Sequence, residues 1–333
     1  MTVAGRVRME DVAREAGVSV ATVSKVVNGR YGVSRATTER VTNVIHALGY
    51  ETSLGAASLR SLKTNVIGVL VAEFEPFSTE LLKGVSEAIA STDYDLLAFS
   101  GGHRGDMVGW ERRSLARLGG SLIDGAIIVT PTVVEAGTGI PVVAVDPHTG
   151  RSDVPTVDAD NVAGGEMATR HLLDLGHRRI AMLTGRPDLE SSRQREEGFR
   201  RAMATAGVAI DETLVRVGGY RPESAEAPAR ELLTRPDRPT AIFAANDLSA
   251  IRTIEVAQEL GLRVPEDLSV IGFDNVPESA MAVPPLTTIN QPMREIGATA
   301  LSILVGLLEE RPPATNHVQL PTSMVERSSC APL

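Results

Sequence analysis

Two series of short apolar segments, each separated from the next by a helical stretch, constrain the fold of this chain most strongly. The first series comprises residues 66–72, 94–100, 125–130 and 142–146, and the second comprises residues 179–185, 213–219, 241–247 and 268–274. Continuous apolar strands that alternate with helices are typical of parallel sheets covered by helices on both faces. The sequence therefore predicts an α/β fold with two parallel sheets, and residues 285–292 are expected to cross between them.

The N-terminal segment 9–32 has a different pattern, that of two short helices joined by a tight turn. One face of the first helix carries small apolar residues, namely Val12, Ala13 and Ala16. Gly17 follows and can adopt the positive φ that ends a helix, and Ser19 is placed to cap the next one. A third helix is expected after Ser34. Small apolar residues let short helices cross closely, as in a helix-turn-helix, with an ordinary three-helix bundle as the alternative.

Residues 8–62 resemble the N-terminal segment of the lactose-repressor family of bacterial regulators. The matching segments are DVAREAGVS at 11–19, TVSKVVNG at 22–29, VSRATTERV at 33–41, ALGY at 47–50 and AASLRS at 56–61. The resemblance continues to the C-terminus. It implies a sequence-specific DNA-binding repressor whose operator affinity is lowered by a small-molecule effector.

The resemblance also implies a domain order. A three-helix helix-turn-helix domain is expected at 1–51, a hinge helix at 52–63 and a two-lobed, periplasmic-binding-protein-like effector and dimerisation domain at 64–333. The first lobe is expected to comprise about 64–158 and 288–317, and the second about 159–287 and 318–333.

Charge is distributed unevenly along the chain. The whole chain has a formal net charge of −9, whereas residues 1–63 carry nine Lys or Arg against five Asp or Glu. The first 63 residues are therefore basic and the remainder is strongly acidic. A basic module on an acidic body is the pattern of a protein that binds DNA with one part of its surface.

The second helix is the candidate recognition helix, whose first residues would enter the major groove. The residues expected to face base edges are Val20, Ala21, Ser24 and Lys25. Lys25 can donate to guanine O6 or N7, whereas the two apolar residues can contact only groups such as a thymine methyl. A solvated surface lysine is the alternative for Lys25. Contacts to phosphates, which position the protein without reading sequence, are expected from Thr22, Asn28, Arg30 and Tyr31.

In the hinge, the resemblance implies DNA contacts from Ser58 and Leu59. Leu59 would insert into the minor groove beside its copy from a second subunit, and such wedging offsets unstacking by bending the duplex. The alternative for Leu59 is packing against the following domain.

Ligands of open α/β sheets bind beyond the carboxyl ends of the strands. The side chains at or after those ends give the candidate effector site: Phe77, Ser100, Asp146, Arg195, Tyr220, Asn246 and Asp274. The resemblance places Arg195, Tyr220, Asn246 and Asp274 among effector-contacting positions. A guanidinium and a carboxylate can each hold two adjacent hydroxyls, and an aromatic ring can cover the apolar face of a sugar. A mono- or oligosaccharide is therefore the expected effector. The alternatives are a turn cap for Asp274, a surface ion pair for Arg195 and packing between the lobes for Phe77 and Tyr220. Asn246 and Asp247 could instead cap the next helix, and for Asp247 the cap is the expected role.

Other classes of protein receive little support. The sequence contains no dinucleotide-binding glycine motif, no P-loop and no zinc-protease motif, and its histidines are scattered, so we expect no catalytic residues, metal or cofactor. Cys330 is the single cysteine, which excludes an intramolecular disulfide. No apolar run approaches the ~20 residues of a membrane span, and no secretory signal is visible, so a cytoplasmic protein without a membrane role is expected.

The expected partners are a palindromic operator, a sugar and a second copy of the chain, because the symmetry of an operator matches that of a dimer. Three rival interpretations remain. The first is a transport-type sugar-binding protein, and the second is an enzyme that uses the cleft. The third is the same regulator with a corepressor, such as a purine, that strengthens DNA binding.

Overall fold

The computed structural model describes residues 7–27, 31–50, 63–101, 109–132, 139–149 and 153–333. The chain forms two compact units, residues 1–64 and residues 65–333. Each unit has its own apolar core. None of the helices in the described ranges is both long and apolar enough to span a bilayer.

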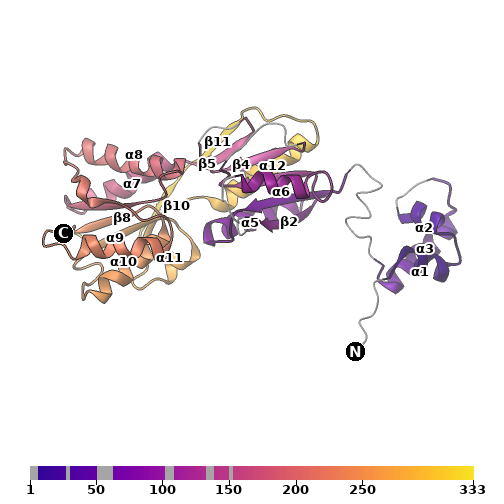
Figure 1. The fold of residues 1–333 in the computed structure, drawn as a ribbon, viewed down its shortest axis with the longest axis horizontal. Coiled ribbons are helices and arrows are strands. Elements are labelled where there is room, and N and C mark those ends of the chain that lie inside the picture. Colours follow the sequence, from indigo (N-terminus) through magenta and orange to yellow (C-terminus); the bar gives the residue numbers. More distant parts are fainter. Residues whose placement is uncertain (1–6, 28–30, 51–62, 102–108, 133–138, 150–152) are drawn as a thin grey trace. The chain divides into compact units, whose positions relative to one another are not determined.

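The N-terminal unit contains three helices, α1 (Met9–Ala16), α2 (Val20–Val27) and α3 (Arg35–Leu48) (Figure 1). Its core consists of Val12, Ala13, Ala16, Val23 and Val41. Gly17 ends α1 with a φ of 62°, a conformation that glycine adopts without steric cost.

Caps of the expected kind begin the next two helices. The Ser19 hydroxyl accepts a hydrogen bond from the Thr22 amide over 3.1 Å, and that of Ser34 accepts one from the Thr37 amide over 3.2 Å. The predicted helix-turn-helix arrangement is confirmed. The predicted hinge helix at 52–63 lies almost entirely outside the described residues.

The second unit contains two lobes, each built on a six-stranded sheet with helices on both faces (Figure 1). The first sheet has the order β11-β5-β4-β3-β1-β2, and all its strands are parallel. Its strands are β1 (Val66–Val71), β2 (Asp95–Ser100), β3 (Gly125–Val129), β4 (Val142–Val145), β5 (Thr156–Ala159) and β11 (His317–Leu320).

The second sheet has the order β12-β10-β9-β8-β6-β7, in which only β12 is antiparallel to its neighbour among the described strands. Its strands are β6 (Ile180–Thr184), β7 (Val215–Val217), β8 (Ala241–Ala244), β9 (Ser269–Asp274), β10 (Thr287–Asn290) and β12 (Ser323–Val325). The α/β fold with two parallel sheets is therefore confirmed, with an antiparallel edge added by β12.

Helices cover both faces of each sheet, which explains why the fully buried strands β1, β3, β4, β6 and β8 are almost entirely apolar. In the first lobe α5 (Pro76–Ile89) and α12 (Met293–Leu308) cover one face and α6 (Trp110–Leu118) covers the other. In the second lobe one face packs against α7 (Asn161–Asp174) and α8 (Glu190–Thr205). The opposite face packs against α9 (Pro222–Leu233) and α10 (Asp247–Glu259), and the short α11 (Pro277–Met281) follows β9.

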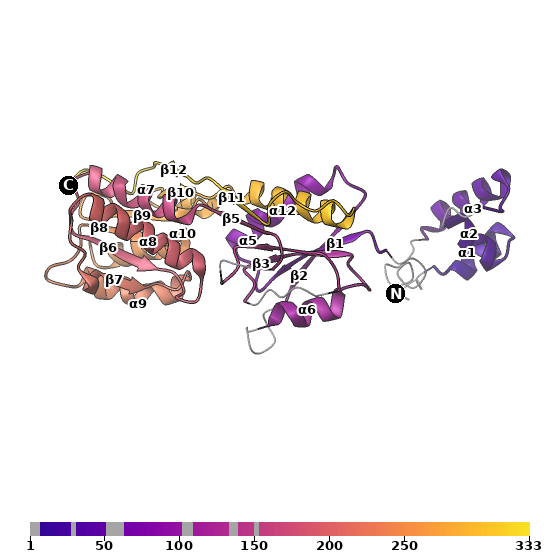
Figure 2. The same ribbon diagram turned by 90° about the horizontal axis from the view of Figure 1, so that it is seen from above.

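The chain crosses between the lobes at three places: after β5, between β10 and α12, and between β11 and β12 (Figure 2). Two expected lobe boundaries need correction. Residues 288–290, expected in the first lobe, pair with β9 of the second sheet, and residues 318–320, expected in the second lobe, pair with β5 of the first. A crossing segment can extend either sheet, so its lobe is decided by the neighbouring strand and not by its own sequence.

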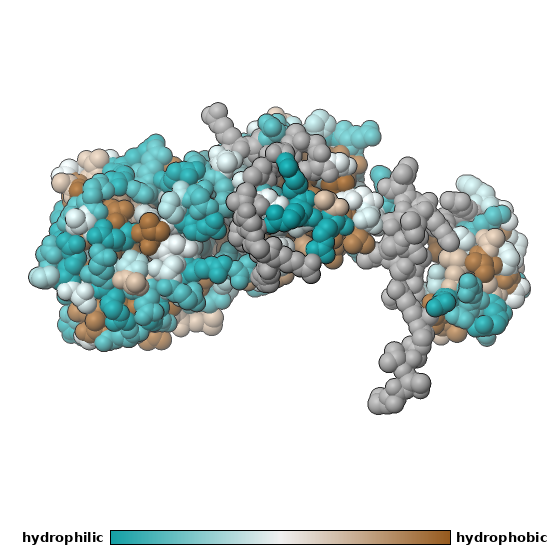
Figure 3. Space-filling view, viewed as in Figure 1, coloured by the Kyte–Doolittle hydropathy of each residue, from teal (hydrophilic) through white to brown (hydrophobic). Residues whose placement is uncertain are grey.

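The surface of the two lobes visible in Figure 3 is mainly hydrophilic, with apolar residues scattered over it. Isolated apolar residues are normal on soluble domains and mark no site by themselves. The candidate site lies instead in the cavity between the lobes.

Candidate functional site

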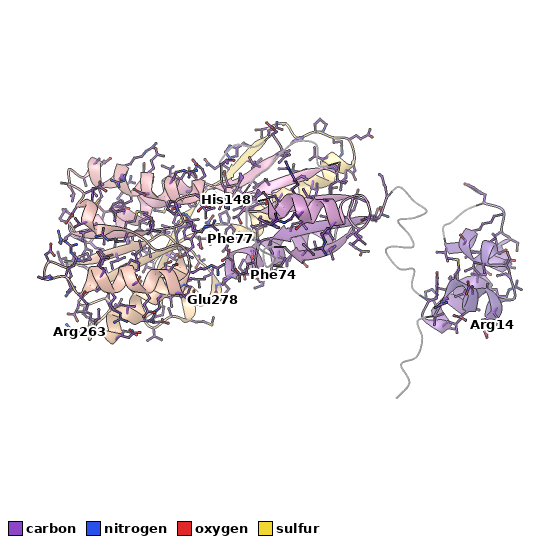
Figure 4. The ribbon with its side chains drawn as sticks, viewed as in Figure 1. Arg14, Phe74, Phe77, His148, Arg263 and Glu278 are labelled. Atoms are coloured by element: carbon purple, nitrogen blue, oxygen red, sulfur yellow. The ribbon has the colours of Figure 1, made fainter. Side chains whose placement is uncertain are left out.

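A cavity lies between the two lobes, beyond the carboxyl ends of their strands. The first lobe contributes the ends of β1, β3 and β4 and the start of α5, and the second contributes residues that follow β6, β7, β8 and β9. Figure 4 shows Phe77 and His148, both cavity residues, in the region between the lobes. This is the position at which open α/β sheets bind ligands.

The structure brings six of the seven candidate residues to this cavity: Phe77, Asp146, Arg195, Tyr220, Asn246 and Asp274. Ser100 lies elsewhere, because β2 is the outermost strand of its sheet. The Ser100 hydroxyl donates to the carbonyl of Ala72 over 3.0 Å, and Ser100 borders a separate hollow beside Phe99 and Trp110. Its expected place in the effector site is therefore corrected.

A buried ion pair between Arg195 and Asp274 lines the cavity. Nη1 of Arg195 lies 3.2 Å from Oδ1 of Asp274, and it also donates to the carbonyl of Ala245. Only 3% of Arg195 is exposed, so the surface ion pair considered for it is excluded. A guanidinium held this way presents a fixed set of donors to anything that enters the cavity.

Two aromatic rings lie against this guanidinium. The Arg195 guanidinium carbon lies 3.8 Å from the centre of the Phe273 ring and 5.4 Å from that of Tyr220. These distances are within the range of cation–π attraction, which is strengthened when the cation is removed from water. The rings therefore contribute to holding the Arg195 guanidinium in place beside the cavity.

Close helix packing explains why Arg195 points inward. It lies on the buried face of α8 with Ser191 and Phe199, and Gly165 of α7 passes directly over it. A Cβ at Gly165 would lie 2.4 Å from the Arg195 carbonyl oxygen, which is too close for any other side chain. The α7–α8 contact thus fixes the backbone from which the guanidinium extends.

Four cavity residues other than glycine have positive φ angles: Thr130 (48°), Asp146 (49°), Tyr220 (69°) and Asp274 (112°). Such angles are uncommon in residues other than glycine, and they cluster at functional sites where the surrounding structure enforces them. All four follow or end strands that point at the cavity. The backbone is therefore turned sharply at the positions that present side chains to a ligand.

Burial alters the ionisation of the acidic and phenolic groups in the cavity. It raises the pKa of Asp146 to about 6, against the opposing effect of Arg195. Burial also raises the pKa of Asp274 and of Tyr220 above their usual values, again opposed by Arg195. The Tyr220 hydroxyl is buried near Ser191 and has no hydrogen-bond partner of good geometry among the described residues.

Asn246 and Asp247 have separate roles at the start of α10. Asn246 is the N-cap of α10, because its Oδ1 accepts from the Ser249 amide over 3.1 Å, and its Nδ2 donates to the Tyr220 carbonyl over 3.0 Å. Asp247, expected as the cap, is instead the first residue of the helix and is fully buried, where it accepts from the amide of Val276.

Sequence reasoning missed two groups of residues at this site. The first holds the ion pair: Asn161 accepts from Nε of Arg195 over 2.9 Å, and Gln291 donates to Oδ1 of Asp274 over 2.6 Å. Both lie at lobe crossings, and neither ends a strand of the apolar series, so no local signal marks them.

The second missed group joins the lobes around the cavity. Glu73 of the first lobe pairs with Arg221 of the second. Nδ1 of His148 lies 3.3 Å from Asp188, and the His148 carbonyl accepts from Arg193 over 3.2 Å. Burial lowers the pKa of His148, so the neutral imidazole is favoured in this arrangement.

The N-terminal unit presents part of the expected DNA-binding set. Val20, Ala21, Lys25 and Tyr31 are exposed, with Val20 42% exposed despite its apolar side chain, whereas Thr22 and Ser24 are half-buried. The hydroxyl of Thr22 lies 2.9 Å from that of Ser19 within the capping turn. Asn28, Arg30, Ser58 and Leu59 lie outside the described residues.

Comparison with known proteins places both units. Residues 8–53 match the model of the bacterial regulatory proteins of the lacI family, and residues 169–330 match a periplasmic binding protein-like domain. The HTH-type transcriptional repressor PurR of Aliivibrio fischeri (strain MJ11) is 35% identical, over 96% of this chain and 97% of that protein. The chain belongs to the lacI family.

Solved structures of lacI-family regulators agree with the architecture. The transcriptional regulator CelR in complex with cellobiose is 32% identical and matches with a TM-score of 0.73 over 97% of this chain and 100% of its own. The Lac repressor dimer bound to operator and the anti-inducer ONPF is 26% identical and matches with a TM-score of 0.84, over 98% and 100%. This lacI-family protein is thus a DNA-binding transcriptional repressor with an effector-binding domain, and its relatives are regulators and not enzymes.

Proposed function

We propose that this repressor binds a palindromic operator as a homodimer and that a sugar bound between its lobes lowers its operator affinity. The observation that carries the sugar assignment is the buried Arg195–Asp274 pair with the Tyr220 ring beside it. Paired charges hold hydroxyl groups by strong hydrogen bonds, and a ring covers the apolar face of a pyranose or furanose. The CelR relative was solved with cellobiose, which is consistent with this chemistry.

The release of DNA follows from a difference in affinity between two lobe arrangements. A sugar that contacts both lobes favours the arrangement in which its contacts are complete, and it shifts the population only by its preference for that arrangement. The three lobe crossings allow such a change without unfolding either sheet. A repressor of this kind acts on chromosomal DNA, so a cytoplasmic location belongs to the same proposal.

A thermal-shift screen tests the effector class directly. The purified protein is heated with cellobiose, D-ribose and other mono- and oligosaccharides, with hypoxanthine and guanine as purine controls. A sugar at 100 times its Kd should add ~2.7 kcal/mol to the free energy of unfolding, which gives a visible shift in Tm. Shifts with purines and with no sugar would overturn the sugar assignment.

The sign of regulation needs a DNA-binding measurement. An operator is obtained by in vitro selection from random duplexes, and its affinity is measured with and without the sugar that raised Tm. We expect a palindromic consensus, a dimer in sedimentation, and weaker operator binding when the sugar is present. Stronger operator binding in its presence would contradict induction and make the ligand a corepressor.

A further inference from the structure

Asn161 links the first lobe crossing to the effector site. It is the residue at which α7 begins, two residues after the end of β5, and it is 1% exposed. Its Nδ2 donates to the carbonyl of Ala159, the last residue of β5, over 3.1 Å. Its Oδ1 accepts from Nε of Arg195 over 2.9 Å. One amide group therefore contacts a strand of the first lobe and the guanidinium of the second.

Gln291 occupies the corresponding place at the second crossing. It follows β10 of the second lobe and precedes α12, which packs on the first lobe, and it is 4% exposed. Its backbone amide donates to the Asp274 carbonyl over 3.2 Å, and its Nε2 donates to Asp274 Oδ1 over 2.6 Å. Gln291 thus holds both the backbone and the carboxylate of Asp274.

These contacts form one continuous chain of hydrogen bonds between two crossings. It runs from the Ala159 carbonyl through Asn161 to Arg195, then across the ion pair to Asp274 and on to Gln291. Its members are buried, where a hydrogen bond lost by a polar group is not replaced by water. A shift of either crossing therefore changes the geometry of the ion pair.

We propose that Asn161 and Gln291 are positioning residues that couple the Arg195–Asp274 pair to the angle between the lobes. A ligand that fixes the ion pair then restricts both crossings, and a change in lobe angle moves the two charges that bind the ligand. An effect of this coupling on DNA binding rests on the proposed effector site, whereas the coupling between the two crossings does not.

The coupling is tested without ligand by hydrogen–deuterium exchange on the full-length protein. Asn161→Asp keeps an oxygen that accepts from Arg195 and removes the N–H that donates to Ala159. Gln291→Met keeps the length of the side chain and removes the donor to Asp274. Gln258→Met is the matched control, because Gln258 donates to the Val283 carbonyl on the exposed side of α10, away from the crossings.

The expected result is reciprocal. Asn161→Asp should accelerate exchange about fivefold at residues 287–293 as well as at 156–163, since loss of one buried hydrogen bond changes an opening equilibrium by about that factor. Gln291→Met should likewise accelerate exchange at residues 156–163, while β3 and β8 stay protected from exchange in both variants. Gln258→Met should change neither crossing. Acceleration confined to the mutated crossing, or spread through β3 and β8, would overturn the proposal.

The effect of this coupling on DNA binding is tested with cellobiose as the probe. In the wild type, saturating cellobiose should weaken operator binding, and in Asn161→Asp the ratio of operator Kd values with and without cellobiose should fall toward one. If the variant binds cellobiose and releases the operator as fully as the wild type, the coupling has no effect on DNA binding and that part of the proposal is overturned. A wild type that ignores every sugar overturns the proposed effector, and the reciprocal exchange still decides whether the crossings are coupled.

Discussion

The side-chain amide of Asn246 donates to the backbone carbonyl of Tyr220 over 3.0 Å while its oxygen caps α10. Tyr220 has a φ of 69°, so this bond holds a strained backbone in place beside the cavity. A helix cap and the position of the aromatic ring therefore depend on one side chain.

Substitutions at Asn246 should separate these two roles. Asn246→Ser retains a capping oxygen but cannot reach Tyr220, whereas Asn246→Ala loses both contacts. We expect Ala to lower the free energy of unfolding by ~1 kcal/mol relative to Ser, the usual value of a cap. Both variants should bind sugar more weakly than the wild type because Tyr220 is no longer held. Denaturant unfolding and sugar titration measure these effects, and a Ser variant with unchanged affinity would exclude the positioning of Tyr220.

Asp146 should make stability depend on pH between about 4 and 6. Its pKa is about 6 in the folded protein and near 4 in the unfolded chain, so the folded state binds the proton more tightly. Stability should therefore rise as pH falls through 6, and the penalty of the buried charge is fully present above 6. Asp146→Asn removes this penalty and should be more stable than the wild type at pH 7.5, by up to about 3 kcal/mol.

The measurement for Asp146 is the difference in Tm between the variant and the wild type from pH 4.5 to 8. Other groups titrate in both proteins and largely cancel in the difference. The advantage of Asn should shrink as the pH falls from 7.5 to 4.5. A difference that stays constant over this range would show that Asp146 has an ordinary pKa.

The pair between Glu73 and Arg221 joins the two lobes at the cavity, so it should influence sugar affinity more than overall stability. Both side chains are about half exposed, so the pair contributes no more than ~1 kcal/mol. Arg221→Glu should weaken sugar binding by up to about fivefold, and Glu73→Arg added to it should restore binding. Isothermal titration at low salt and at high salt checks this, because screening should reduce the loss. If the variant that carries both charge reversals does not recover sugar affinity, the result would argue against a direct pair between Glu73 and Arg221.

Lys25 should contribute to the choice of operator sequence. It is exposed on α2, on the same exposed surface as Val20 and Ala21. Lys25→Ala should weaken binding to the selected operator by ~1–3 kcal/mol and relax preference at one base pair, whereas a phosphate contact would weaken all sequences alike. Arg40→Ala on α3 is a control for loss of general positive charge. Equal losses on operator and random DNA would assign Lys25 to phosphate.

The strand pattern was sufficient to predict four strands of each sheet, because most of these strands are buried and rich in apolar residues. It was insufficient for β5, whose TVDA sequence contains Thr156 and Asp158. It was also insufficient for β11 and β12, which are short and lie on one outer edge of each sheet. The apolar signal is therefore lost where a strand carries polar residues, as in β5, or is short and partly exposed, as in β11 and β12.

The residues of the candidate site were likewise predicted only in part. The predicted strand ends identified six of the cavity residues, because the carboxyl ends of parallel strands lie at the same edge of a sheet. The order of the strands is a long-range property, so the sequence could not show that β2 is an outer strand and that Ser100 lies away from the cavity. Asn161 and Gln291 were missed because their roles arise from contacts between segments far apart in the chain.

The positive φ angles around the cavity have a consequence for redesign of the repressor as a sensor. Libraries for a new ligand usually vary every side chain that lines a pocket. At Asp146, Tyr220 and Asp274 the backbone itself disfavours most replacements, especially branched ones, so much of such a library would be lost to misfolding. Phe77, Ser191 and Leu248 line the same cavity from helices with ordinary backbone angles. Diversity placed at those three positions would sample ligand shape while leaving the strained turns intact.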